Sequence, residues 1–147
     1  MAWLREIKYL KNYVGRMERG EDLLGALESF ARSNKIRLAK IEAIGALEKA
    51  CVAYHDQNTL EFNVVELDGP LEILNLTGNL SLGENKPVFH GKITVADTQG
   101  RAFGGHLLMG SIVFACEFFI HEYSGTELHR NYDEASGLSL WMAPPVK

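Results

Sequence analysis

The middle of the chain reads Gly69-Pro70-Leu71-Glu72-Ile73-Leu74-Asn75-Leu76, then His90 after a short loop, and then Gly104-Gly105-His106-Leu107. The first motif places a turn before an apolar run, which predicts a largely buried strand. The second motif is a glycine pair beside a histidine and an apolar run. Because two glycines allow a positive φ or a close approach to another segment, we expect the functional site near this histidine.

Outward from this segment, most of the chain reads as strands separated by turn residues. Alternating or apolar runs predict strands over 8–17, 37–44, 50–54, 60–67, 71–80, 88–96 and 111–123, with turns at 55–58, 68–70, 83–87 and 97–100. Short connections favour antiparallel neighbours. The pattern predicts an α+β fold: a mostly antiparallel sheet of six or more strands with one main amphipathic helix packed on it.

That helix is predicted over 22–34. Asp22 is a suitable N-cap, and Asn34 suits the left-handed residue that often ends a helix. The apolar residues between them recur at helical spacing: Leu23, Leu27, Phe30 and Ala31. One face of the helix should therefore pack on the sheet.

The run 111–120 is apolar on both strand faces, and such a strand is covered on both sides. One helix can cover only one face of the sheet, so a second copy of the chain is expected to cover the other. The sequence therefore predicts an oligomer.

Glu117 lies inside this run, and a buried carboxylate needs a partner or takes up a proton. Lys92 and His106 are the candidate partners.

Composition is that of an ordinary globular protein, with 46% hydrophobic residues and a formal net charge of −4. We expect one domain over 1–147, with a core at about 5–130 and an irregular tail from 131. The net negative charge argues against sequence-independent binding of nucleic acid over a wide surface, but not against a local basic patch. Cys51 and Cys116 lie in apolar runs, so reduced, buried thiols are expected. No signal peptide or membrane-length apolar run is seen, which predicts a cytoplasmic protein.

Five motifs come in the order found in the PPC domain, the "plants and prokaryotes conserved" domain, also called domain of unknown function 296. They are Glu18-Arg19-Gly20-Glu21-Asp22-Leu23, Ile44-Gly45-Ala46-Leu47, the segment 69–76, His90, and the segment 97–108 with its glycine pair. The chain resembles this family over about residues 5–130. The resemblance implies a compact α+β domain that forms homotrimers. It also implies protein–protein contacts through the segment 69–76, for which the candidate residues are Gly69, Leu71, Glu72, Ile73 and Leu74.

The resemblance further implies a DNA-binding or regulatory role, because plant members carry AT-hook motifs that bind the minor groove of A/T-rich DNA. This chain has no AT-hook, and its only Arg-Gly pair is Arg19-Gly20 at the predicted helix entrance. DNA binding is therefore expected to be weak or indirect, acting through assembly or a protein partner. Prokaryotic members often show His-x-His in the strand before the glycine pair, where this chain has His90-Gly91-Lys92.

The candidate ligand-binding residues are His90, Lys92, Gly104, Gly105, His106 and Glu117. Residues 90 and 92 share one face of a strand because side chains alternate. A metal on His90 and His106 would need further ligands from Glu117, His121 or another subunit, because the Lys92 ammonium repels a divalent cation. Two imidazoles, an ammonium and glycine amides could instead hold a small anion such as phosphate or carboxylate. In a third interpretation the histidines only hydrogen-bond across a subunit interface.

The remaining histidines have plainer interpretations: His121 at a strand end on the surface, His55 in a polar turn, and His129-Arg130 as an exposed basic pair. No phosphate-binding loop or nucleophile elbow is present, so enzymatic activity is not predicted. The sequence thus predicts a homotrimeric PPC-type protein of the DNA-binding or regulatory family, with no cofactor. The alternative is a small-anion or metal-binding sensor, or a minor enzyme, that uses the His/Lys site.

Overall fold

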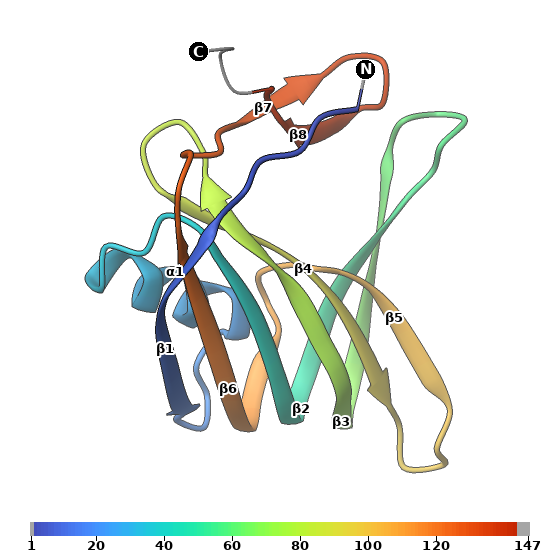
Figure 1. Cartoon of the computed structure of the whole chain (residues 1–147). Helices are drawn as coiled ribbons and strands as arrows, with labels where there is room; N and C mark the ends of the chain where they lie inside the picture. Colours follow the sequence, from blue (N-terminus) through green and yellow to red (C-terminus); the bar gives the residue numbers. More distant parts are fainter. Residues whose placement is uncertain (1, 144–147) are drawn as a thin grey trace.

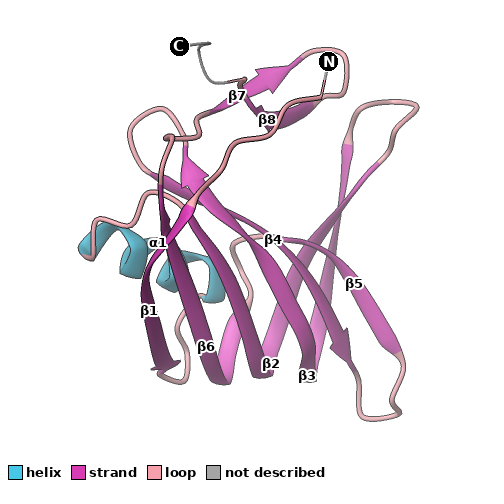
Figure 2. Cartoon of the chain, viewed as in Figure 1, coloured by secondary structure: helices cyan, strands magenta, loops and turns pink. Residues whose placement is uncertain are grey.

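The computed structural model describes residues 2–143, which form one helix and eight strands (Figure 1). The elements are β1 (Lys8–Met17), α1 (Leu23–Ser33), β2 (Ala39–His55), β3 (Phe62–Leu82), β4 (Pro87–Ala96), β5 (Ala102–Leu107), β6 (Ile112–Ser124), β7 (Arg130–Asp133) and β8 (Leu138–Trp141). Figure 2 shows how far strands outweigh helix. The predicted α+β class is confirmed. Within the described range, no helix has the length and apolar character needed to cross a membrane.

Six strands form one antiparallel sheet in the order β1-β6-β2-β3-β4-β5. The sheet curls, because β5 also pairs with the end of β2, where Val52 faces Leu107 and Ala53 faces His106. The remaining strands, β7 and β8, form a separate antiparallel hairpin. Figure 1 shows this hairpin at the same end of the molecule as the loop between β2 and β3.

The helix is anchored at its first turn by Asp22, the N-cap that the sequence predicts. Its carboxylate accepts hydrogen bonds from the Gly25 N–H at 2.9 Å and from the Gly110 N–H at 2.6 Å, so it caps α1 and holds the loop before β6. At the other end the prediction was wrong by one residue. Asn34 has a φ of −97°, and the left-handed residue is Lys35, with a φ of 57°.

The hydrophobic core lies between α1 and one face of the sheet. Leu23, Leu27 and Ala31 are fully buried along one side of the helix, as their spacing predicts. They join inward side chains of the central strands, among them Ile41 of β2 and Ile93 of β4. A fully buried leucine contributes about 1.5–3 kcal/mol by leaving water, so this face holds the helix on the sheet.

Two pairs of predicted strands are each a single long strand. The segments 37–44 and 50–54 merge into β2, and the segments 60–67 and 71–80 merge into β3. The predicted turn at 68–70 is therefore wrong: Gly69 and Pro70 lie inside β3, joined by a cis peptide bond, where the register to β2 shifts. A Cβ on Gly69 would lie 2.5 Å from the Glu48 carbonyl oxygen, so glycine permits the close approach of β3 to β2.

The glycine pair lies inside a strand, β5, that the sequence did not predict. Gly104 and Gly105 are not in the left-handed region. A Cβ on them would lie 2.7 Å from the Ile93 carbonyl oxygen and 2.8 Å from that of Ala53, respectively. Of the two roles that the sequence allowed, a close approach is therefore the correct one, and the approaching segments are neighbouring strands.

The C-terminal region also differs from prediction, because the expected irregular tail from 131 contains most of the β7–β8 hairpin. The Ala143-Pro144-Pro145 end of that tail lies outside the described residues from position 144 onward.

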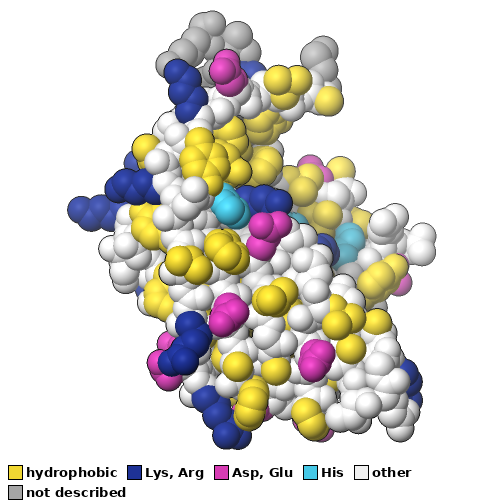
Figure 3. Space-filling view, turned by 60° about the horizontal axis from the view of Figure 1, so that its bottom comes forward, with side chains coloured by type: hydrophobic (Ala, Val, Ile, Leu, Met, Phe, Trp, Pro, Cys, Tyr) yellow, Lys and Arg dark blue, Asp and Glu magenta, His cyan; other side chains and the backbone are white. Residues whose placement is uncertain are grey.

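The strand β6 is not covered on both faces within the chain. Its side chains alternate between buried and exposed, and Phe119 is 52% exposed. Glu117 is also exposed, opposite Arg16 of β1 and Ile44 of β2, so the prediction of a buried carboxylate is wrong for the single chain. Figure 3 shows exposed hydrophobic side chains interspersed with charged ones.

Candidate functional site

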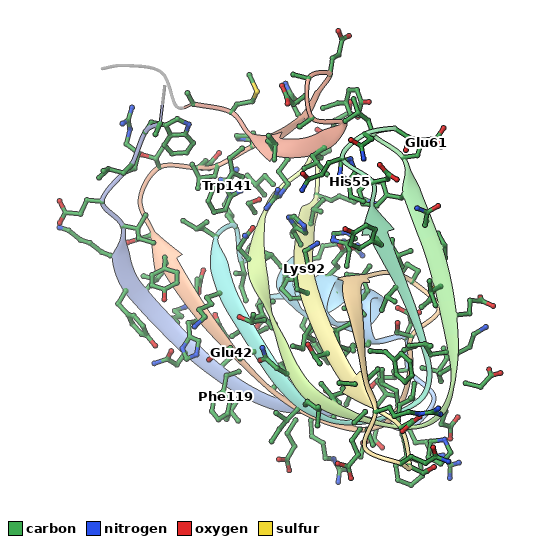
Figure 4. All side chains as sticks on the ribbon, turned by 90° about the vertical axis from the view of Figure 1, so that its right-hand side faces the viewer. Glu42, His55, Glu61, Lys92, Phe119 and Trp141 are labelled. Atoms are coloured by element: carbon green, nitrogen blue, oxygen red, sulfur yellow. The ribbon has the colours of Figure 1, made fainter. Side chains whose placement is uncertain are left out.

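A cavity of about 350 Å³ lies where the β7–β8 hairpin meets the curled part of the sheet. Its lining residues come from β3, β4, β5, and the hairpin with its turn: Phe62, Val88, Phe89, His90, His106, Arg130, Tyr132, Gly137, Leu138 and Ser139. The turn of the hairpin contacts the β2–β3 loop, because a Cβ on Gly137 would lie 2.9 Å from that of Leu60. Figure 4 shows Lys92, His55 and Trp141 around this region of the sheet.

Strand alternation places the predicted site residues on one face. Phe89, Gly91 and Ile93 of β4 are buried, so His90 and Lys92 project from the other face. In the register of the sheet, Lys92 lies directly opposite His106 of β5. Side chains of directly opposed residues share a face, so the structure brings together His90, Lys92 and His106 as the sequence predicted.

The two imidazoles are in contact. Their ring centroids are 4.6 Å apart in an edge-to-face arrangement, and Phe62 lies 6.0 Å from the His106 ring. The Nδ1 atom of His106 is buried and has no hydrogen-bond partner within the described residues. The same holds for Nε2 of His55, which lies at the end of β2 rather than in the predicted turn. A buried ring nitrogen without a partner costs free energy, so this site is incomplete in the chain by itself.

Arg130 also lines this cavity, and it was not among the candidate site residues that the sequence predicted. It was expected to be exposed, but only 8% of its surface is accessible. Its guanidinium donates from Nε to Ser81 Oγ at 3.0 Å, from Nη1 to the Ser139 carbonyl at 2.9 Å and from Nη2 to Asn79 Oδ1. All three partners are neutral, and no carboxylate of residues 2–143 pairs with this cation. A buried charge without a counter-charge is expensive.

The electrostatics of the cavity follow from this excess of positive groups. Burial lowers the pKa of His90 from 6.5 to about 4, assisted by His106 and by the charges of Arg130 and Lys92. Burial and the same two cations also lower the pKa of His106. Lys92 itself is exposed, does not line the cavity, and forms no ion pair in the described part of the chain. Both imidazoles are therefore neutral at pH 7. An anion would offset the positive potential of the Arg130 and Lys92 side chains.

A metal does not fit this set of residues. The two imidazoles share the cavity with the Arg130 guanidinium, and Lys92 lies on their strand face. Both cationic side chains repel a divalent cation. No carboxylate completes the ligand set: among the described residues, no group of three or more His, Cys, Asp or Glu side chains could hold a metal ion. The structure therefore does not favour the metal interpretation of His90 and His106.

Two of the predicted ligands lie elsewhere. Glu117 is on β6, which pairs with β1 and β2 rather than with β4 or β5, so it does not join the histidines. His121, also on β6, lies beside β1: its Nδ1 is 3.1 Å from the Tyr9 hydroxyl and its Nε2 is 3.4 Å from Glu42. The glycine pair contributes the close packing of β5 that positions His106, and no left-handed nest of amides.

The predicted interaction segment lines a second cavity, of about 670 Å³, at the register shift between β2 and β3. Gly69, Leu71 and Glu72 contribute to its wall. Leu71 and Ile73 are themselves buried in the core, whereas Leu74 is 50% exposed. The segment therefore offers alternate residues to the core and to the surface.

Comparisons with known proteins agree with this fold. The model of the Plants and Prokaryotes Conserved (PCC) domain matches residues 5–124. A GlmU, described as a bifunctional protein, from a Synechococcus strain is 33% identical over 130 residues, 87% of this chain and 20% of that protein. The chain thus spans about a fifth of the length of the curated relatives it matches.

Solved structures are similar over nearly their whole length. A metal-containing protein from Archaeoglobus fulgidus is 38% identical with a TM-score of 0.92, covering 97% of this chain and 100% of that one. A plant- and prokaryote-conserved protein from Pyrococcus horikoshii is 30% identical, with a TM-score of 0.91 and coverage of 99% and 100%. A "putative DNA binding protein" from Bacteroides thetaiotaomicron is 26% identical, with a TM-score of 0.82 and coverage of 92% and 96%. By its sequence and by its fold, this chain belongs to the Plants and Prokaryotes Conserved domain family.

Proposed function

We propose that this protein binds a small anion in the cavity formed by His90, His106 and Arg130, with Lys92 at its edge. One observation carries the proposal: Arg130 is 8% exposed, and its guanidinium hydrogen-bonds only to neutral groups. Desolvating a cation without an opposite charge is costly, and a bound anion removes that cost. Charge-assisted hydrogen bonds from guanidinium and imidazole donors are the strong kind that anion sites use.

A thermal-shift experiment on the full chain tests this function. Inorganic phosphate, acetate and zinc chloride are added separately, in a zwitterionic buffer at low ionic strength. We expect an anion to raise the melting temperature and zinc to leave it unchanged. The Lys92→Met variant should weaken the anion effect several-fold. Lys11→Met removes another exposed charge, on the opposite edge strand β1, and should leave the anion effect intact. The proposal is wrong if no anion raises the melting temperature or if the two variants respond alike.

We also propose that the protein assembles as a homotrimer through the open face of its sheet. Val14, Ile44 and Phe119 are 75%, 59% and 52% exposed on adjacent strands of that face. Exposed apolar side chains gathered in this way favour burial against another protein surface, and identical copies are the simplest partner. Light scattering should give three times the chain mass, and Phe119→Asp should lower that mass. A wild-type monomer at micromolar concentration would exclude this assembly.

DNA binding is the second candidate function, because two similar structures, 26% and 28% identical to this chain, are described as those of "putative" DNA-binding proteins. The net charge of −4 and the lack of an AT-hook argue for a weak or indirect interaction, through a protein partner or through the assembly. A gel-shift experiment with A/T-rich duplex at about 50 mM salt tests direct binding, whose affinity should fall steeply as salt rises. Absence of a shift at micromolar protein would leave only an indirect role.

A further inference from the structure

The cavity combines hydrogen-bond donors with apolar walls, and this combination bears on the class of anion in the proposed function. The donors are His90, His106 and Arg130. Beside them the lining includes four largely apolar side chains: Phe62, Val88, Tyr132 and Leu138. Inorganic ions have no apolar surface, so they would leave these walls in contact with water. Ligand sites with mostly apolar walls and a few directed polar groups are typical for organic molecules.

We propose that the ligand is an organic monocarboxylate with a compact apolar body. The inference rests on the proposed anion site and adds the chemistry of the ligand. The carboxylate is held by Arg130, and the body lies against Phe62 and Leu138. His106, whose Nδ1 atom is buried without a partner in the described part of the chain, also lines this cavity.

The hydrogen bonds of Arg130 favour a carboxylate over a phosphate. A guanidinium has five N–H groups, and three of them are used by Ser81, Ser139 and Asn79. One N–H therefore remains on each terminal nitrogen. Two such donors match the two oxygens of a single carboxylate in a bidentate pair. A phosphate would bring a third oxygen and a second charge, and the second cation, Lys92, is exposed and does not line the cavity.

The size of the cavity limits the body of the ligand. A volume of about 350 Å³ corresponds to roughly a dozen water-sized groups, since each water occupies about 30 Å³ in the liquid. An aromatic or branched-chain carboxylate fits within this space. The ring of Phe62 is 44% exposed in the chain by itself, so a ligand body can cover its free surface.

Isothermal titration of the full chain with a matched series of compounds tests this inference. Benzoate carries both head and body, acetate only the head, benzamide only the body, and phenyl phosphate the same body on a phosphate head. We expect benzoate to bind at least ten-fold more tightly than acetate and than phenyl phosphate, and benzamide to show no binding. Phe62→Ala should weaken benzoate several-fold and leave acetate unchanged. Phe103→Ala removes a similarly exposed ring on the other face of β5 and should change neither.

The outcomes separate this inference from the proposed function. If acetate and benzoate bind equally, in a manner sensitive to Lys92→Met, the site binds anions but the apolar body is wrong. If phenyl phosphate binds more tightly than benzoate, the choice of a carboxylate is wrong. If no compound binds, both proposals fail. A variant that does not reach the native fold is recognised by its circular dichroism spectrum, and Leu138→Ala then takes the place of Phe62→Ala as the probe of the apolar wall.

Discussion

Replacement of His90 by glutamine should remove part of the acid sensitivity of this protein. Burial, with the neighbouring positive groups, lowers the pKa of His90 from 6.5 to about 4 in the folded chain. The unfolded chain therefore binds a proton at this residue at a higher pH than the folded chain does. Folding stability is unaffected well above pH 6.5 and falls as the pH decreases from 6.5 towards 4. Glutamine keeps a polar side chain of similar length and does not titrate.

The magnitude follows from the difference between the two pKa values. One pKa unit is worth about 1.4 kcal/mol, and the two proton-binding curves together give a loss of about 2 kcal/mol between about pH 7.5 and about pH 5. Solvent screening at this half-buried ring makes this an upper value. For a chain of this length, 1 kcal/mol shifts the melting temperature by about 2–4 °C. The melting temperature of His90→Gln should therefore fall by up to about 4–8 °C less than that of the wild type over this pH interval.

The assay is urea unfolding, with thermal melts in parallel, at one protein concentration and in buffers free of small carboxylates. His129→Gln is the matched control, because His129 is exposed beside Glu127 and lies outside the cavity. The stability of His129→Gln should depend on pH as strongly as that of the wild type. If His90→Gln loses as much stability as the wild type between the two pH values, the electrostatic description of the cavity is refuted. Saturating carboxylate should reduce the wild-type loss, because a bound anion favours the protonated imidazole.

Three further predictions test how the fold supports the site. Asp22→Ala should destabilise the protein by about 2 kcal/mol in urea unfolding, since it removes a helix cap and a second amide partner; the wild-type midpoint would contradict this. Gly78→Ala should cost several kcal/mol, because its Cβ would lie 2.2 Å from the His90 carbonyl oxygen. Gly100→Ala, with a φ of 76° and no atom within 4 Å of its Cβ, should cost only about 1 kcal/mol. Cys116, whose pKa burial raises to about 11, should react with a thiol reagent only on unfolding; rapid reaction of the native protein would be the contrary result.

The parts of the fold that local patterns determine could be predicted from the sequence. The helix and its cap at Asp22 could be predicted from the spacing and chemistry of nearby side chains. The strand β1 has the bounds of the single strand that the sequence predicts over 8–17. Turn propensity at Gly69-Pro70 gave the wrong result, because the bulged pairing of β3 with β2 overrides it. At the glycine pair no strand was predicted, although β5 runs through it. Glycine there serves a close approach of strands, and that requirement arises only once the sheet is assembled.

The candidate site could be predicted only in part. Alternation on one strand placed His90 with Lys92, and the glycine pair directed attention to His106. Arg130 could not be found in this way, because its burial depends on hydrogen bonds to Asn79 and Ser81, about fifty positions earlier in the chain. A local signal did exist. The residues 130–141 form two short runs with aromatic residues around a turn that ends in glycine, which is a hairpin pattern.

The sign of the charge in this cavity is set by two residues that come from different parts of the chain. His90 and His106 alone would not decide between a metal and an anion, since a neutral imidazole offers a lone pair to a metal and an N–H donor to an anion. Lys92 adds a cation from the same strand face, and Arg130 adds a second one from the hairpin that covers the cavity. The hairpin supplies both the buried cation and part of the apolar wall. The proposed preference for a compact anion therefore depends on Arg130 and on the apolar side chains of the same hairpin.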